Sequence, residues 1–590
     1  MHSIWLLPMI FSFLPSALGV IGPPANSSTN STLLNPILPG FHPDPSCVFV
    51  SEWNNTFFCA SSSFEAFPGV PIHASRDLQN WKLVGNALNR PEQIPDLAIT
   101  NKSTSGIWAP ALRFHNGTFY ITTTLVFDDQ PQTNLSRWYN ILLSSNNPYN
   151  ESSWTDPIHF DFVGYDTSLF WDSDGSVYVT GSHPYNLQPG INQAPISLTT
   201  GAVGSITNVW NGTGGLAPEG PHVYFKDDWY YLMIAEGGTG LNHEEDIARS
   251  RNINGPYESN PANPIVTNAN TSAYFQTVGH ADLFQDANGN WWGCALSTRS
   301  GPEYIVYPMG RETVLTSVTW ASGKFPVFTN VSGTETSWPL PPSDLSIPGS
   351  GPFINAPDAY TFPPGSTIPA HFAFWRLPIS QNYVVSPSER PNSLRLTAST
   401  LNLTGYDGNY AATGQTFLGR RQVDSFFTYS VTLSFAPTAA EHEAGVSVFL
   451  VQSHHIDLGV VLLPSSSTST SSANDTALTP YFRLRTTTSI PVPAPIQLTP
   501  VPAAWIQPNA PLELRLQIQA CNLTHYAFGA APVGAAHEML TLGYGEAAAV
   551  SYGFTGTLVG VYATTNGGEE GGVEAYVGDW RYEGMGQVRD

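Results

Sequence analysis

Apolar and polar residues alternate along most of the chain in short runs, and each run ends at Gly, Asn, Asp or Pro. A period of two is typical of β-strands, whereas the 3.6-residue period of amphipathic helices is almost absent. The pattern therefore predicts an all-β protein.

One hairpin motif recurs five times in the N-terminal half, and in each copy a polar turn leads into a strand that begins with aromatic residues. The turns are Asn54-Asn55, Asn116-Gly117, Asp174-Gly175, Asp227-Asp228 and Asn288-Gly289. Their spacing of roughly 55–60 residues suits a four-stranded propeller blade with its loops. We predict a five-bladed β-propeller over residues 30–335, with two stacked sandwiches as the alternative.

The composition changes after the last repeat. Residues 337–369 are rich in Pro, Ser and Gly, as in linkers between domains. Strands such as 426–435 then continue with another rhythm, and the aromatic hairpin does not recur. We predict a linker over residues 337–369 and a single jelly-roll β-sandwich over residues 370–590.

The N-terminal residues 1–19 contain an apolar run of signal-peptide length that is too short to span a membrane. About a dozen Asn-x-Ser/Thr sequons follow. Cys47 and Cys59 flank a short hairpin and could pair in an oxidising compartment. We expect a secreted, glycosylated protein that has lost residues 1–19; a buried N-terminal segment is the alternative.

Charge narrows the range of partners. The 590 residues include 22 Lys and Arg against 45 Asp and Glu, a net charge of −23, which argues against nucleic acid. Charged residues make up only 11% of the chain. Carboxylates that lie in uncharged segments are therefore candidates for a functional role.

Three such carboxylates lie beside predicted blade starts. Asp44 lies between two prolines, Asp166 follows Tyr165, and Glu219 lies in an Ala-Pro-Glu-Gly-Pro segment. The innermost strand of each blade lines the central channel, so the three would converge. Carboxyls held close together raise one another's pKa, which gives the protonated and ionised pair that glycoside cleavage requires. The alternative for each is a local turn cap.

Motifs of other chemistries are missing: there is no serine-hydrolase elbow, phosphate-binding loop, dinucleotide fingerprint or zinc-protease motif in the sequence. The acidic run 243–246 lacks a second His at helical spacing, and we interpret it as a solvated loop beside a strand. No metal site and no required cofactor are predicted.

The segment 35–46, NPILPGFHPDPS, resembles the N-terminal signature of glycoside hydrolase family 43. Later segments resemble further motifs of that family in the same order; they are residues 108–110, 166–170, 219–222, 279–282 and 310–313. The C-terminal region, through residues 417–422 and 443–446, is similar to the concanavalin-A-like sandwich attached to many xylosidases and arabinofuranosidases of the family.

The resemblance implies roles for the carboxylates. Asp44 would be the general base that activates water, and Glu219 the general acid that protonates the glycosidic oxygen. Asp166 would raise the pKa of Glu219 and orient it. The family inverts the anomeric centre, which implies base and acid carboxyls about 6.5–9.5 Å apart.

Four further residues are candidates for substrate binding. Arg311 would bind sugar hydroxyls, and Trp108 would offer a stacking face to the sugar. Tyr165 would border the leaving-group subsite, and His280 would sit in the channel, holding a water or a structural ion. Core packing is the alternative for Trp108, Tyr165 and His280.

The implied function is exo-acting hydrolysis of pentoses from plant xylan, with α-L-arabinofuranosidase action on arabinoxylan first and β-xylosidase action second. Both activities share this architecture and all three carboxylates. The expected partner is cell-wall polysaccharide, with no nucleic acid or membrane, and we expect a monomer. A non-catalytic carbohydrate-binding protein and a retaining glycosidase, with carboxyls about 5–5.5 Å apart, are the remaining alternatives.

Overall fold

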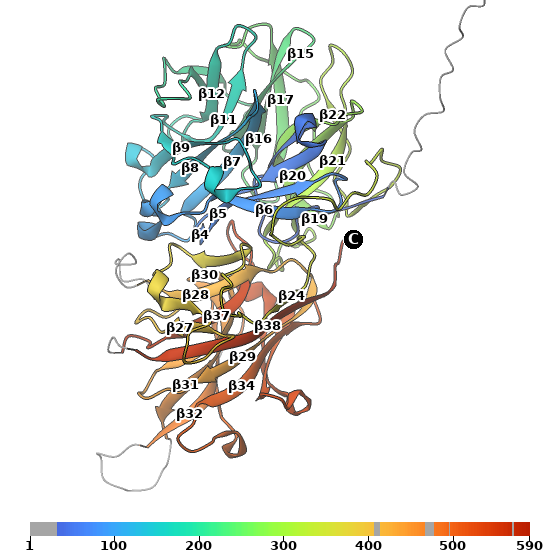
Figure 1. Ribbon diagram of the computed structural model, residues 1–590. Helices are drawn as coiled ribbons and strands as arrows, with labels where there is room; N and C mark the ends of the chain where they lie inside the picture. The colour runs from blue at the N-terminus through green and yellow to red at the C-terminus, as the bar shows by residue number, and fades with distance from the viewer. Residues whose placement is uncertain (1–31, 406–413, 466–476, 495, 569–571) are drawn as a thin grey trace, which may run out of the picture.

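The computed structural model describes residues 32–405, 414–465, 477–494, 496–568 and 572–590. The predicted signal peptide, 1–19, lies outside these ranges. The N-terminal part (blue to yellow-green) is stacked on the C-terminal part (yellow to red), as Figure 1 shows. Within the described ranges the helical elements are short 3-10 turns, and none is a candidate for crossing a membrane.

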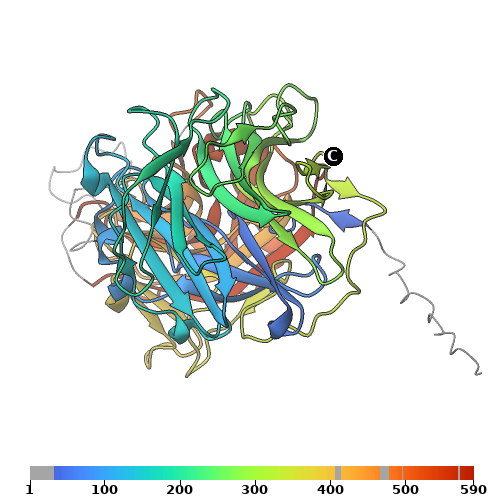
Figure 2. The same cartoon turned by 90° about the horizontal axis from the view of Figure 1, so that it is seen from above.

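The N-terminal part is a five-bladed β-propeller, as predicted, built from five four-stranded antiparallel sheets. Seen from above in Figure 2, the propeller lies in front of the sandwich. The blades comprise β2 (Ser46–Val50), β3 (Thr56–Ala60), β5 (Gly69–Ser75) and β6 (Lys82–Leu88); β7 (Gly106–His115), β8 (Thr118–Val126), β9 (Trp138–Ser145) and β10 (Ile158–His159); β11 (Tyr165–Trp171), β12 (Val177–Ser182), β13 (Ile191–Pro195) and β14 (Thr207–Trp210); β15 (Glu219–Lys226), β16 (Trp229–Glu236), β17 (Glu244–Ser250) and β18 (Glu258–Ser259); and β19 (Phe275–Gln285), β20 (Trp291–Arg299), β21 (Arg311–Thr319) and β22 (Val327–Phe328).

Each predicted hairpin turn joins the first and second strands of a blade. Asn116 and Gly117 have φ of 49° and 79°, and Asp227 and Asp228 have 53° and 59°. Two successive left-handed residues make the tight turn that matches strand twist, and Asn, Asp and Gly tolerate this backbone best. In the first blade, the disulfide Cys47–Cys59 joins directly opposed positions of β2 and β3.

The C-terminal part is a β-sandwich, also as predicted. One sheet has the order β26-β27-β38-β29-β34-β35-β36, with β24 at β38, and the other has the order β33-β32-β31-β30-β37-β28-β25-β4. The strands are β24 (Asp358–Tyr360), β25 (Phe372–Trp375), β26 (Tyr383–Val385), β27 (Leu394–Thr397), β28 (Thr416–Arg421), β29 (Phe426–Phe435), β30 (Glu443–Val451), β31 (His454–Pro464), β32 (Leu478–Thr487), β33 (Ile496–Pro500), β34 (Leu512–Ala520), β35 (His525–Pro532), β36 (Leu540–Glu546), β37 (Leu558–Thr564) and β38 (Glu574–Gly586).

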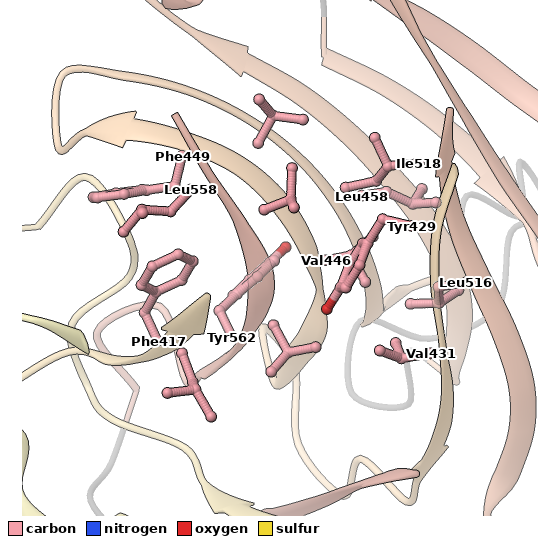
Figure 3. Close-up of a cluster of buried hydrophobic side chains, with 14 of the residues drawn as sticks. Phe417, Tyr429, Val431, Val446, Phe449, Leu458, Leu516, Ile518, Leu558 and Tyr562 are labelled. Atoms are coloured by element: carbon pink, nitrogen blue, oxygen red, sulfur yellow. The ribbon is translucent and has the colours of Figure 1, made fainter. Parts of the chain in front are cut away.

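The sandwich core forms between the inward faces of its two sheets. Figure 3 shows Val446 and Tyr562 from one sheet facing Tyr429 and Val431 from the other. Inward residues alternate with outward ones along each strand, as the period-two pattern requires; in β34 every second residue from Leu512 is buried.

Propeller and sandwich are joined by strand pairing and by a buried ion pair. The short strand β4 (Ala66–Phe67), which belongs to the first blade's connections, pairs with β25 and extends a sandwich sheet. Arg376 Nη2 lies 2.6 Å from Glu65 Oε1, and both side chains are buried. Residues of the 337–369 segment lie along the first blade, where Ile354 N donates to the Trp81 carbonyl at 2.9 Å. Together, the strand pairing, the ion pair and the packing of this segment fix the sandwich against one face of the propeller.

Candidate active site

The first strands of the five blades pack side by side around the propeller centre. Four of them, β7, β11, β15 and β19, carry register shifts in their pairing with the second strand of the blade. These bulges fall at Trp108, Tyr165, Glu219 and Gly279. A bulge bends the strand and redirects the side chain beside it, so the same local device turns residues of four blades toward one place.

Left-handed backbone accompanies the carboxylates. Asp44 and Asp166 both have φ of 52°, and His280 has φ of 50°. A non-glycine residue in this region carries strain of about 1–2 kcal/mol. Because three such residues meet at the propeller centre, their conformations indicate a functional site rather than a contribution to stability.

All seven residues that the sequence singled out line a single pocket: Asp44, Trp108, Tyr165, Asp166, Glu219, His280 and Arg311. Three more residues complete the lining, namely Phe64, Thr239 and Phe554. The pocket therefore takes side chains from the propeller and one from the sandwich.

Asp44 is a buried acceptor with both oxygens occupied. Arg311 Nη1 donates to Asp44 Oδ1 at 2.8 Å, and Nη2 donates to Oδ2 at 3.4 Å. The Ser62 hydroxyl donates to Oδ2 at 2.6 Å. Charge-assisted bonds of this kind are made to a carboxylate, which is the form that a general base needs.

Arg311 is itself fixed by two parts of the molecule. Its Nη1 also donates to Thr239 Oγ1 at 3.1 Å, and its Nε donates to the Phe554 carbonyl at 3.0 Å. The guanidinium carbon lies 5.2 Å from the centre of the Phe554 ring. The sandwich thus helps to place the cation that holds the candidate base.

Asp166 is the carboxyl with the most strongly perturbed titration in the pocket. Burial, together with the negative charges of Glu219 and Asp44, raises its pKa well above the ordinary range, although the Gly220 N–H donates to Oδ2 at 3.1 Å. Two nearby carboxyls that repel each other as anions retain a proton between them to higher pH. The raised pKa favours the protonated form of Asp166 in the pocket.

His280 lies between two of the carboxylates. Its Nδ1 is 4.0 Å from Asp44 Oδ1 and 4.0 Å from Asp166 Oδ2. Burial lowers the pKa of His280, which favours the neutral ring. Across the described ranges no group of three or more His, Cys, Asp and Glu is arranged to hold a metal ion.

Glu219 is the most accessible of the three carboxylates, with 17% of its side chain exposed. The basic side chain beside it is His243, whose Nε2 lies 3.6 Å from Glu219 Oε1. His243 Nδ1 lies 2.9 Å from the Thr277 carbonyl and must donate to it, because a carbonyl only accepts. When the ring is neutral, Nε2 therefore presents a lone pair toward Glu219.

The interpretation of residues 243–246 as a solvated loop is wrong. His243, Glu245 and Asp246 are buried, and all but His243 belong to β17. Glu245 Oε2 accepts from the Ala281 N–H of the next blade at 2.9 Å. Burial and the neighbouring Glu236 raise the pKa of Asp246 to about 8. This strand can be buried because its carboxyls find donors or keep a proton.

Aromatic rings form the pocket walls. The rings of Trp108 and Tyr165 meet edge to face with centroids 5.9 Å apart, and Trp108 meets Phe554 in the same way at 6.0 Å. Tyr165 is buried and stacks on Trp138 at 5.2 Å. Trp108 is half-buried and its Nε1 donates to the Thr104 carbonyl at 2.9 Å. Tyr165 is therefore also a packing residue, while Trp108 keeps some of its ring toward the pocket.

Sequence reasoning missed Phe64, Thr239 and Phe554. Thr239 lies in a Gly-Gly-Thr-Gly run directly after β16, and this cluster was the available signal for a functional loop. Phe64 lies just outside β3 in a loop of the first blade. Phe554 reaches the pocket only through the packing of the sandwich on the propeller, which no local pattern encodes.

Comparison with known proteins agrees with this site. The family model described as glycosyl hydrolases family 43 matches residues 33–325, and the β-xylosidase C-terminal concanavalin A-like domain matches residues 361–583. The chain is 34% identical to a non-reducing end α-L-arabinofuranosidase of Bacteroides ovatus, over 92% of this chain and 93% of that protein. It is 31% identical to a β-xylosidase of Bacillus subtilis, over 70% and 76%.

A solved structure shows the same architecture. The crystal structure of xylan β-1,4-xylosidase from Bacillus halodurans is similar with a TM-score of 0.78 and 28% identity, and the match covers 93% of this chain and 100% of that one. Since a relative more than 30% identical matches nearly the whole chain and both family models fit in order, this protein belongs to glycosyl hydrolase family 43.

Proposed function

We propose that this enzyme is a secreted, inverting exo-glycosidase that removes terminal pentoses from plant xylan, with α-L-arabinofuranosidase action on arabinoxylan side chains as its main activity. The observation that carries the proposal is the convergence of Asp44, Asp166 and Glu219, from three blades, in a pocket with Arg311. The arabinofuranosidase assignment is supported by the similarity to the Bacteroides ovatus enzyme.

The proposed chemistry divides the work between two carboxyls. Asp44, which accepts hydrogen bonds from Arg311 and Ser62, takes a proton from a water that attacks the anomeric carbon. Glu219, the more accessible carboxyl, gives its proton to the glycosidic oxygen as the bond to the leaving sugar breaks. Asp166 and Glu219 repel each other as anions, so the two carboxyls together tend to keep one proton in the pocket.

Export is proposed on separate grounds. The apolar run in residues 1–19, the sequons and the Cys47–Cys59 disulfide all suit an oxidising extracellular compartment.

β-Xylosidase action is the second candidate, since the C-terminal part matches a β-xylosidase domain and several relatives carry that name. The test is NMR of sugars released by the purified protein from wheat arabinoxylan and from xylo-oligosaccharides, with Glu219→Gln as the inactive control. Free arabinose from the polymer, formed with inversion, supports the main proposal. Xylose from the oligosaccharides alone assigns the second candidate.

No sugar from either substrate, or equal release by Glu219→Gln, would contradict both assignments. A released sugar with retained configuration would contradict the inverting mechanism alone. Glu258→Gln, an exposed glutamate on β18, is the matched control and should release sugar at the wild-type rate.

A further inference from the structure

A second cavity, distinct from the active-site pocket, lies where three segments of the chain meet. The first blade contributes residues 42, 73 and 83, residues 352–356 pass along one side, and the end of β28 closes it. The cavity volume is about 30 Å³. A single water needs roughly 10–15 Å³ of such space, so the cavity has room for one small ion or about two waters.

The polar lining of this cavity is entirely basic. The side chains concerned are His42, His73, His371, Arg420 and Arg421, and the other lining residues are apolar. His42, His73, Arg420 and Arg421 are each less than a tenth exposed. A site built from cations and imidazoles, with no acidic side chain in its lining, calls for a negative ligand.

Arg421 carries a charge that the protein does not balance. Its Nε donates to the Phe41 carbonyl at 2.9 Å, but Nη2 is buried and has no hydrogen-bond partner in the described part of the chain. No carboxylate of the described residues lies within ion-pair distance of its guanidinium. Burial lowers the pKa of Arg421 only to about 10, so it stays charged near neutral pH. A buried cation without a counter-ion is strongly destabilising.

The carboxylate that pairs with Arg420 is already engaged. Asp358 Oδ1 lies 3.1 Å from Arg420 Nη1 and accepts from His371 Nε2 at 3.0 Å, while Oδ2 accepts from Trp580 Nε1 at 3.2 Å. The pair of Asp358 and Arg420 is neutral as a whole. Asp358 therefore does not neutralise the charge of Arg421.

Burial favours the neutral form of the histidines, and one of them, His73, is free to donate a hydrogen bond. Burial lowers the pKa of His73 to about 3, and burial together with His73 and Arg421 lowers that of His42. The Nδ1 atoms of His73 and His371 are buried without a partner among the described residues. His42 Nδ1 donates to the Pro39 carbonyl and His371 Nε2 donates to Asp358, so the second nitrogen of each of these neutral rings carries a lone pair and cannot donate to an anion. His73 makes no such bond among the described residues, so its proton can lie on the nitrogen that faces an anion.

We propose that this cavity is a binding site for a small inorganic anion of the halide class, with Arg421 as the charged ligand. The charge of the lining selects an anion, and the volume admits a monatomic ion. Since Arg421, His73 and residues 352–356 belong to the sandwich, the propeller and the segment between them, the anion ties all three together. The site is independent of the proposed substrate and reaction.

The first test locates the ion in the unaltered protein. Crystals of the full chain are soaked in sodium bromide, and anomalous scattering is measured at the bromine edge. We expect a peak within hydrogen-bonding reach of the Arg421 guanidinium. Ordinary water at that position with no anomalous signal would overturn the proposal.

The second test measures stability. Thermal unfolding is followed in sodium chloride and in sodium gluconate at equal ionic strength, because gluconate is too large for the cavity. Ligand that binds only the folded state raises the apparent melting temperature, here by about 2–4 °C at saturating chloride. Arg421→Gln should abolish the difference between the salts, whereas Arg581→Gln, at an exposed arginine, should keep it.

Equal unfolding of the wild type in the two salts, or an unchanged chloride response in Arg421→Gln, would also overturn the proposal. If Arg421→Gln does not fold, His73→Phe, which removes a neutral donor only, takes its place and should weaken the chloride response.

Discussion

Asp166 is held in the pocket against two electrostatic costs, its burial and the negative charges of Glu219 and Asp44. A raised pKa in the folded state means that the folded chain binds more protons than the unfolded chain between the two pKa values. Stability therefore falls as the pH rises through that interval. At neutral pH Asp166 therefore lowers the free energy of unfolding. Residues of catalytic centres are often kept for activity at such a cost in stability.

We accordingly expect the free energy of unfolding of Asp166→Asn to exceed that of the wild type at pH 7 by on the order of 1 kcal/mol. This difference should shrink as the pH falls toward 4. Asn also tolerates the left-handed backbone and can accept from Gly220 N. The same variant should lose about 10²-fold or more in kcat. Thermal unfolding and kinetics across pH check both. A stability difference that grows toward low pH would contradict the argument, and Asp161→Asn, fully exposed, should change neither.

His243 is the only basic side chain of the described residues within ion-pair distance of Glu219. Its Thr277 contact leaves Nε2 free to accept from the protonated acid or, when charged, to donate to the ionised one. In either state it orients the carboxyl, so it is a positioning residue rather than a catalytic one.

We expect His243→Ala to lower kcat about tenfold on glycosides with a poor leaving group, and much less on an activated nitrophenyl glycoside that needs no acid. Rates over a series of leaving groups measure this. An equal loss on all leaving groups would indicate a merely structural role. His159→Ala, a partly exposed histidine on β10, is the control.

At the scale of elements, the bulge in β15 links the acid to its neighbours. Gly220 follows Glu219 with φ of 59°, and its N–H donates to Asp166. An added Cβ would lie 3.1 Å from three atoms of the His280 ring, closer than an ordinary contact. The glycine therefore allows Glu219, Asp166 and His280 to approach one another.

Gly220→Ala is expected to reduce kcat by about tenfold or more through displacement of His280 and Glu219, and to destabilise the fold by about 1–2 kcal/mol. Gly117→Ala separates strain from contact, since Gly117 has φ of 79° but no atom within 4 Å of the added Cβ. It should lose stability and keep full activity. Activity losses of equal size in both variants would show that strain alone, not the approach of His280, explains the effect.

The features that could be predicted are those determined by residues close together in the sequence. The five hairpins follow from turn residues that tolerate left-handed backbone, and the carboxylates of the pocket follow from motifs at blade starts. The burial of β17 could not be predicted, because the donor to Glu245 is the Ala281 amide of the following blade. Phe554 was missed for the same reason, since its place depends on packing between residues far apart in the chain.

At the scale of the whole molecule, the sandwich contributes to the active site through one loop. Phe554 supplies a backbone carbonyl to Arg311 and a ring to the pocket wall beside Trp108. The two contributions differ in what they affect. The carbonyl helps to hold the cation that fixes Asp44, whereas the ring offers apolar surface to the bound sugar.

A side-chain substitution separates these roles. Phe554→Ala keeps the carbonyl, so we expect KM to rise about tenfold, the equivalent of about 1.4 kcal/mol of binding, while kcat stays within a few-fold of the wild type. Steady-state kinetics on a small aryl glycoside measure the split, and Tyr544→Ala, at an exposed tyrosine of the sandwich, should behave as the wild type. A fall in kcat with KM unchanged would mean instead that the ring holds Arg311 and Asp44 in place. The contact between propeller and sandwich would then position the base rather than bind the sugar.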